Sequence, residues 1–310
     1  MLSEKNPPNF IEQLLSKAKR KPVSNEAICS LSYEKACCKG RGLVFDNKGT
    51  FARAKLCTCV IKCGACKGDM RLLKGGVMRS CRKPSPAYIC NLVNSAMIPS
   101  RYTFAELSDF ANKTGNCATI VNQIKNWEKK FSKNSERGLL MAGTIGVGKT
   151  FILAALAKDF LLRGYSVKFI DFFQLITQIK ASYSDHKSEL SVLQPLIDVD
   201  ILIIDELGKG RNTDFELTIL DQMIMGRYNQ NKILIASTNY TLEPQEQQRN
   251  NFYQNIDLER EGDPKGSAFS PDSFGSLSPR IGKRIMSRLR ETTFFLNLEG
   301  QDYREIKDKS

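Results

Sequence analysis

The chain has 310 residues, a length that predicts about two domains, and its 41% apolar and 25% charged residues are usual for a globular protein. This composition excludes a collagen-like or wholly disordered chain. No apolar run reaches the ~18 residues that a membrane span needs, and the first residues lack the apolar stretch of a secretory signal. We therefore expect a cytoplasmic protein that does not associate with a membrane.

Charge and cysteine are concentrated at the start of the chain. The first hundred residues hold 18 Lys and Arg against 6 Asp and Glu, whereas the remainder holds 28 against 27. Nine of the ten cysteines lie in the same first hundred residues. A basic segment indicates an anionic partner such as nucleic acid, although a solvated surface with no particular partner is the alternative.

The apolar spacing of residues 9–20 predicts a helix, and the cysteine-rich segment follows it. Clustered cysteine in a cytosolic chain indicates metal binding rather than disulfides, and zinc takes four thiolate or imidazole ligands. The only histidine, His186, is far downstream, so a zinc site here would be made of cysteine alone. The candidate Zn2+ ligands are Cys37, Cys38, Cys57, Cys59, Cys63, Cys66 and Cys81. Which four share a metal, and whether one or two zincs bind, stays open; reduced buried thiols are the alternative.

Residues 82–100 contain three prolines, which favours a linker or domain boundary. Beyond about residue 118, apolar strand patterns alternate with helical ones. The expected strands are 138–143, 166–171, 198–206 and 232–238, and the expected helices include 150–164 and 214–230. This alternation predicts an α/β fold with a parallel sheet flanked by helices. Residues 244–279 are polar and predict a long loop.

A phosphate-binding pattern, G-x4-G-K-T, lies between an expected strand and an expected helix. Its residues are Gly143, Thr144, Ile145, Gly146, Val147, Gly148, Lys149 and Thr150. Glycines let several backbone N–H groups point at one phosphate, and the following helix adds its positive dipole end. Lys149 is suited to the β- and γ-phosphates, and Thr150 to Mg2+. The alternative is a glycine turn with an exposed lysine.

Acidic side chains end the third expected strand. Asp205 is placed to hold Mg2+, and Glu206 to act as the general base toward an attacking water. Asn239 follows the fourth strand, where an amide could orient that water, but Asn also commonly starts turns. The adjacent acidic pair favours hydrolysis of a nucleoside triphosphate; a solvated strand end is the alternative.

These motifs resemble the AAA+ ATPases of the DnaC/DnaI helicase-loader and IstB group. The matching segments are GTIGVGKT, ILIIDE, the STN that ends in Asn239, and IPSRY at 98–102. The segment GKRIMSRLR at 282–290 resembles the family's arginine-finger helix, which implies that Arg288, or failing that Arg284, reaches a neighbouring subunit's nucleotide. Asp302-Tyr303-Arg304 resembles the sensor 2 segment, which implies that Arg304 contacts the γ-phosphate.

The resemblance implies a P-loop AAA+ ATPase domain over 98–310, although the polar loop at about 244–279 departs from the compact form expected of these loaders. The cysteine pattern predicts a basic, zinc-binding module with an N-terminal helix over 1–97. The resemblance has further implications. It implies ATP and Mg2+ as ligands, homo-oligomerisation in the ATP state, and loading or remodelling of a DnaB-type replicative helicase on single-stranded DNA. Two alternatives remain: an IstB-like helper of DNA transposition that coats duplex DNA, and a scaffold that binds ATP without turnover.

Overall fold

The computed structural model describes residues 38, 41–61, 71–74, 77–80, 84–111, 116–131, 137–184, 186, 188–242 and 274–306. The expected helix 9–20 and the candidate ligands Cys37, Cys63, Cys66 and Cys81 lie outside these residues. Within the described ranges, no helix has the length and apolar character that crossing a bilayer would require.

A five-stranded parallel sheet forms the centre of the molecule, in the order β11-β5-β8-β7-β6. Its strands are β5 (Gly138–Gly143), β6 (Val167–Asp171), β7 (Ile201–Asp205), β8 (Ile233–Thr238) and β11 (Thr293–Leu298). The predicted parallel α/β sheet is therefore confirmed. The third strand is shorter than the expected 198–206 because a helix ends at Asp198, and the fifth strand was not predicted.

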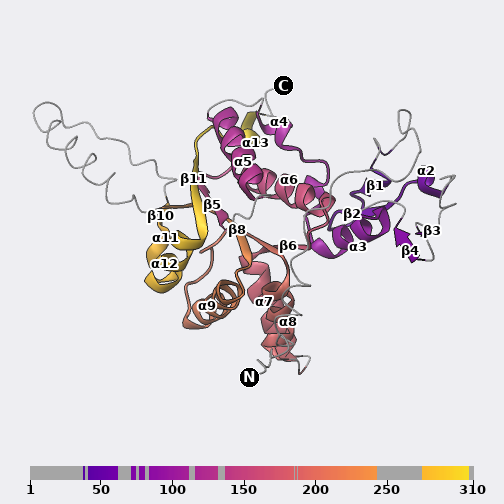
Figure 1. Ribbon diagram of the computed structural model, residues 1–310. Coiled ribbons are helices and arrows are strands. Elements are labelled where there is room, and N and C mark those ends of the chain that lie inside the picture. Colours follow the sequence, from indigo (N-terminus) through magenta and orange to yellow (C-terminus); the bar gives the residue numbers. More distant parts are fainter. Residues whose placement is uncertain are drawn as a thin grey trace, which may run out of the picture.

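Helices cover both faces of this sheet (Figure 1). On one face lie α5 (Cys117–Phe131) and α6 (Lys149–Leu162), and on the other α7 (Phe172–Ser184), α8 (Glu189–Asp198) and α9 (Asp214–Asn229). The helices expected at 150–164 and 214–230 are confirmed as α6 and α9. Each follows a strand or its loop, which is the arrangement that parallel pairing requires.

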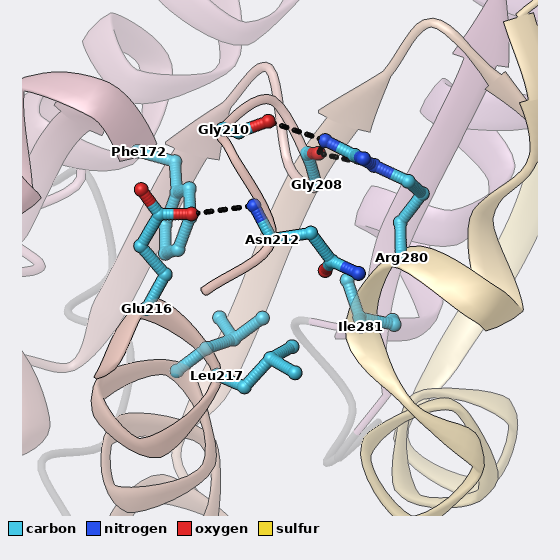
Figure 2. A pocket seen from close by; sticks show the side chains of 9 residues that line it. Phe172, Gly208, Gly210, Asn212, Glu216, Leu217, Arg280 and Ile281 are labelled. Carbon is cyan, nitrogen blue, oxygen red and sulfur yellow. Dashed lines mark hydrogen bonds between the residues drawn. The ribbon is translucent and has the colours of Figure 1, made fainter. Parts of the chain in front are cut away.

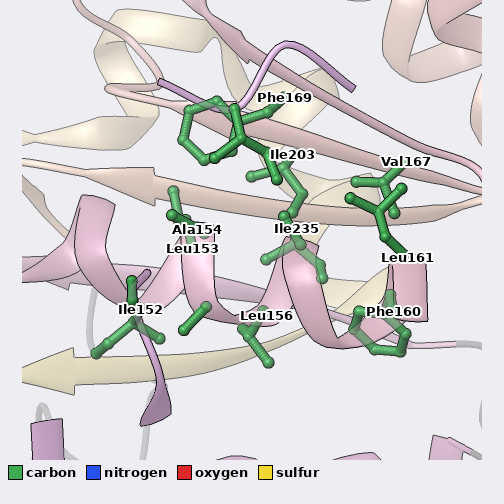
Figure 3. Close-up of a cluster of buried hydrophobic side chains, with 14 of the residues drawn as sticks. Ile152, Leu153, Ala154, Leu156, Phe160, Leu161, Val167, Phe169, Ile203 and Ile235 are labelled. Carbon is green, nitrogen blue, oxygen red and sulfur yellow. The ribbon is translucent and has the colours of Figure 1, made fainter. Parts of the chain in front are cut away.

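The strands contribute alternate side chains to two separate cores. In β7, Ile201 and Ile203 pack with α6 in one cluster, whereas Leu202 and Ile204 pack with α7 and α9 in the other. This division follows from the two-residue period of a strand, and it explains why the strand is an unbroken apolar run. Figure 3 shows the α6 side, where Leu161 of the helix lies near Val167 of β6.

Short elements precede the sheet. They are β1 (Leu43–Asp46), β2 (Arg53–Leu56), α2 (Thr58–Ile61), β3 (Arg71–Lys74), β4 (Val77–Ser80), α3 (Pro86–Ala96), the 3-10 turn η1 (Ser100–Tyr102) and α4 (Leu107–Ala111). The Asn94 side chain bonds both the N–H and the C=O of Ala54, at 2.8 and 3.0 Å, and so ties α3 to β2. Leu43 and Ala54 belong to the same apolar cluster as α5 and α6. The proposed boundary between 97 and 98 stays a prediction.

The linker expected at 82–100 is wrong in its centre, because α3 occupies most of it. The Ser85 side chain accepts a hydrogen bond from the Tyr88 N–H at 3.1 Å, and Pro86 is at the start of the helix. Proline is favoured in the first helical turn, where its missing N–H costs nothing. Pro86 therefore marks the start of a helix and not a linker.

The loop expected at 244–279 is also wrong at its carboxyl end. Residues 274–279 form β10 (Phe274–Ser276), which pairs with β9 (Tyr240–Thr241), and the start of α11 (Leu277–Ile281). Leu277 and Ile281 are buried, so two apolar residues anchor this segment. Residues 243–273 lie outside the described ranges. The remaining elements are α12 (Lys283–Thr292) and α13 (Tyr303–Ile306).

Arg227 of α9 is 2% exposed and aligns two strands that carry the candidate site. Its guanidinium donates to the carbonyls of Leu196, Ile197 and Val199 at 2.6, 3.1 and 2.9 Å. It also donates to carbonyls before β7 and in β8. These bonds satisfy carbonyls at the end of α8 that would otherwise be buried without partners.

We expect Arg227→Met to lower the free energy of unfolding by about 3 kcal/mol or more, because it leaves several buried carbonyls unpaired. Urea unfolding followed by circular dichroism measures this change. Arg101→Met, at an exposed arginine, is the matched control and should change stability little. A loss below about 1 kcal/mol for Arg227→Met would contradict the assigned role.

Candidate nucleotide-binding site

The predicted phosphate loop connects β5 to α6. Gly146 and Gly148 have φ values of 77° and 100°, a backbone region that favours glycine. A Cβ at Gly148 would lie 2.6 Å from the Phe110 ring, so this turn is also closely packed. Gly148 precedes the first residue of α6, so the loop presents backbone N–H groups at a helix N-terminus.

Lys149 folds back over this loop. Its Nζ donates to the carbonyls of Gly143 and Thr144 at 2.8 and 2.7 Å. The pKa of Lys149 is lowered to about 8, chiefly by burial and to a smaller extent by the nearby Arg304, against the raising effect of Asp205 and Glu206. Carbonyl groups of the phosphate loop thus hold the ammonium at the loop itself.

Asp205 ends β7 directly beside the first turn of α6. The Thr150 hydroxyl donates to Asp205 Oδ2 at 2.8 Å, and the Ser237 hydroxyl donates to Oδ1. Burial raises the pKa of Asp205, whereas the hydrogen bonds from Ser237 and Thr150 lower it. The structure thus brings the predicted residues Thr150 and Asp205 together. Sequence reasoning missed Ser237, although a hydroxyl in an otherwise apolar strand was a usable signal.

Glu206 follows in a left-handed conformation, with φ 56°. Its N–H donates to Asp205 Oδ1 at 3.2 Å, and its carboxylate forms an ion pair with Lys209. Asp171 lies in register with Asp205 at the end of β6; burial, followed by the negative charge of Glu206, raises the pKa of Asp171. Sequence reasoning missed Asp171 and Lys209, and only the position of Asp171 at a strand end signalled its place.

Two further predicted residues lie around this edge of the sheet. Asn239 directly follows β8, the strand that supplies Ser237. Arg304 is in α13, whose Tyr303 N–H donates to the Gly146 carbonyl at 3.2 Å. The positive charge of Arg304 is near enough to Lys149 to contribute to its lowered pKa, after the larger effect of burial. The C-terminal segment is thus placed against the phosphate loop, as the predicted role of Arg304 needs.

The two candidate finger arginines lie on α12 and make their contacts with α9. Arg284 forms an ion pair with Asp221 at 3.7 Å and is 67% exposed. Arg288 lies over the Tyr228 ring, 5.7 Å from its centroid, and donates to the Arg284 carbonyl at 3.1 Å. These positions leave both guanidinium groups near the surface of this subunit, away from the contacts that surround Lys149.

The donor set fits Mg2+ and a triphosphate. A hydroxyl and a carboxylate 2.8 Å apart are the hard oxygen ligands that Mg2+ takes together with phosphate oxygens. The glycine turn, the helix N-terminus and the buried ammonium supply the complementary positive field. Fold and site therefore define a P-loop nucleotide-binding protein of the AAA+ class. The chain belongs to the IstB-like ATP-binding protein family, whose profile matches residues 76–251.

The individual curated relatives match over a shorter part of the chain than the family profile does. The chain is 28% identical over 138 residues to the replicative helicase loader DnaC of Escherichia coli (strain K12), which covers 43% of this chain and 56% of the loader. It is 28% identical over 107 residues to DnaC of Buchnera aphidicola subsp. Baizongia pistaciae (strain Bp), covering 34% and 43%. The chain thus spans about half the length of these curated relatives, or less.

Solved structures give a similar comparison. The crystal structure of the DnaC helicase loader aligns with a TM-score of 0.49 and 24% identity, over 64% of this chain and 99% of that one. The crystal structure of DnaI aligns with a TM-score of 0.46 and 19% identity, over 67% and 94%.

Of the candidate zinc ligands, only Cys38 and Cys57 have described side chains, and both are buried. The Gly42 N–H donates to Cys38 Sγ at 3.3 Å, and the Cys57 N–H donates to the Gly42 carbonyl at 3.0 Å. Gly42 therefore links the two cysteines. The backbone of Cys59 lies in α2. Among the residues whose positions are described, no group of three or more potential metal ligands is present.

The lowered pKa of Lys149 predicts a pH dependence for nucleotide binding. Phosphate binding requires the ammonium, which the free protein loses above its pKa of about 8. The affinity for Mg·ATP should be nearly constant below pH 8 and fall by up to ~10-fold per pH unit above it. Fluorescence titration from about pH 7 to 9.5 measures this. Lys149→Arg, which stays charged, should show no such fall; a flat wild-type profile would refute the prediction.

Proposed function

We propose that this protein is a Mg2+-dependent ATPase that loads or remodels a DnaB-type replicative helicase on single-stranded DNA. The ATPase assignment rests chiefly on the junction of Thr150 with Asp205, beside Lys149 and Glu206. The similarity to replicative helicase loaders supports a role in DNA replication. The excess of Lys and Arg in the first hundred residues supports an anionic partner such as DNA.

The proposed chemistry divides among a few side chains. Lys149 and the loop N–H groups hold the β- and γ-phosphates, and Thr150 and Asp205 hold Mg2+. The ion, when bound, neutralises charge that develops on the phosphate oxygens. Glu206 accepts a proton from the water that attacks the γ-phosphorus, and the bond to the ADP oxygen breaks. Asn239 orients this water.

A neighbouring subunit completes the proposed site. Arg288, or Arg284 in its place, reaches the γ-phosphate of the adjacent subunit, which suits their positions on the exposed side of α12. Arg304 contacts the γ-phosphate within its own subunit. Because the γ-phosphate is then bound from two subunits, ATP favours a homo-oligomer, and hydrolysis weakens it.

The alternative function is that of an IstB-like ATPase helper in DNA transposition, which the family match also supports. This alternative predicts preference for duplex DNA and binding to a transposase. Helicase loading predicts preference for single strands and binding to a replicative helicase. In either case, DNA affinity should fall steeply with salt.

We expect Glu206→Gln to lower the rate of ATP hydrolysis by about 10²–10⁴-fold and leave ATP bound, because the amide accepts no proton. Phosphate release measures the rate, and filter binding measures retained ATP. With ATP, the full-length variant should transfer a purified DnaB-type helicase onto circular single-stranded DNA, assayed by gel filtration. Glu299→Gln, at an exposed glutamate that precedes α13, is the matched control and should hydrolyse ATP at the wild-type rate.

Unchanged turnover in Glu206→Gln would remove Glu206 from the mechanism. Preferential binding of duplex DNA, with no helicase transfer in either nucleotide state, would overturn helicase loading and favour the transposition alternative.

We also propose that the cysteine-rich segment binds Zn2+. Cys38 and Cys57 are brought together by Gly42, and an N–H group that points at Cys38 Sγ would stabilise a thiolate. The remaining ligands would come from Cys37, Cys59, Cys63, Cys66 and Cys81. A bound zinc would supply folding free energy to a segment with few large apolar residues.

Elemental analysis of the purified full-length protein should find about one zinc per chain or more. Cys57→Ser should lose most of this zinc and unfold at a lower temperature. Cys90→Ser is the matched control, because burial raises the pKa of the Cys90 thiol and α3 carries it outside the cluster. Less than about half an equivalent in the wild type, or equal zinc in both variants, would overturn the proposal.

A further inference from the structure

The carboxylate of Glu206 is already engaged in this structure. Lys209 forms an ion pair with it, and the Lys209 N–H donates to the Glu206 carbonyl at 3.0 Å in the same turn. This contact is strong enough to raise the pKa of Lys209, chiefly through its hydrogen bond to Glu206. A carboxylate oxygen that accepts from an ammonium is occupied by that contact and is not free to accept from a water molecule.

The ion pair is also easily broken. The Lys209 side chain is 57% exposed and that of Glu206 is 30% exposed, so water screens their attraction. An exposed pair contributes little net free energy, and a modest displacement of the turn is enough to separate the two groups. These properties suit a contact that is made in one state of the protein and lost in another.

Arg280 of α11 forms hydrogen bonds with the turn that carries Lys209. The Arg280 guanidinium donates to the Gly208 carbonyl at 3.2 Å and to the Gly210 carbonyl, so it binds the residues on both sides of Lys209 (Figure 2). From the other side, the Glu216 carboxylate accepts from the Asn212 N–H at 2.8 Å. The position of Lys209 therefore depends on where α11 lies.

Arg280 also connects this turn to α12. Only Ile281 and Gly282 separate Arg280 from the first residue of α12. Gly282 has φ 82°, and a Cβ there would meet nothing within 4 Å, so this junction is open as well as glycine-dependent. The chain therefore connects α12, over only two residues, to the side chain that binds the two carbonyls flanking Lys209.

We propose that Lys209 is a positioning residue that restrains Glu206 in the isolated subunit, and that Arg280 couples this restraint to α12. When a second copy of the chain engages α12, α11 shifts, the turn at 208–210 moves with Arg280, and Glu206 is released toward the attacking water. The inference rests on the proposed function, because it needs Glu206 as the general base. It adds two residues, Lys209 and Arg280, that neither contact the nucleotide nor belong to the family motifs described above.

The test compares ATP hydrolysis at low protein concentration, where isolated subunits predominate. Lys209→Gln should raise kcat by about two- to fivefold and leave KM unchanged, since an exposed ion pair restrains the base only weakly. Lys209→Arg should behave as the wild type. Arg280→Gln should raise kcat similarly, and the double variant should exceed neither single variant, because both act through one contact.

Lys232→Gln is the matched control, because Lys232 forms a comparable ion pair with Asp200 at 3.7 Å at the opposite end of the sheet strands. It should leave kcat unchanged. Thermal unfolding of each variant separates a folding defect, which lowers activity, from release of Glu206, which raises it.

An unchanged or lower kcat in Lys209→Gln, with hydrolysis still strongly reduced in Glu206→Gln, overturns the restraint and leaves the proposed ATPase intact. Additive increases in the double variant overturn the role of Arg280. Wild-type turnover in Glu206→Gln overturns the assignment of the base and the restraint together.

Discussion

The 2.8 Å hydrogen bond from the Thr150 hydroxyl to the Asp205 carboxylate joins the first turn of α6 to the carboxyl end of β7. Because strand and helix meet at this point, the phosphate loop and the acidic pair share one edge of the sheet. Ser237 supports the same carboxylate from the neighbouring strand. Arg227 holds the opposite ends of these strands in alignment. The candidate nucleotide site therefore depends on strand register, and its side chains are supported by buried packing on both faces of the sheet.

Two C-terminal contacts reach this site from different directions. Tyr303 binds the phosphate loop through the Gly146 carbonyl, and Arg280 binds the turn after Glu206. Both belong to the segment after residue 273, which also contains the candidate finger arginines of α12. These contacts join the phosphate loop and the turn after Glu206 to the C-terminal helices, and the coupling that we propose between Glu206 and α12 uses the second of them. A protein whose nucleotide cycle controls the binding of a partner needs such a coupling.

Much of the sheet was predictable because its strands are continuous apolar runs that end in polar residues, and the phosphate loop because its chemistry is contiguous in sequence. The residues that the sequence analysis missed come from elements that are far apart in the sequence and meet only in the folded chain. Asp171 and Ser237 become part of the site only through strand register, and Arg280 only because α11 packs beside a loop some 70 residues earlier. The prolines at 84–86 were misinterpreted because proline serves both linkers and helix starts, and the serine cap decides between them.

The most direct test of the account is a crystal structure of Glu206→Gln with Mg2+ and ATP. The account predicts that the triphosphate lies in the loop at 143–150, with Lys149 on its β- and γ-phosphates. The metal should be bound by the Thr150 hydroxyl, with Asp205 in direct or water-mediated contact. Nucleotide bound elsewhere, or a metal remote from both Thr150 and Asp205, would contradict the central claim.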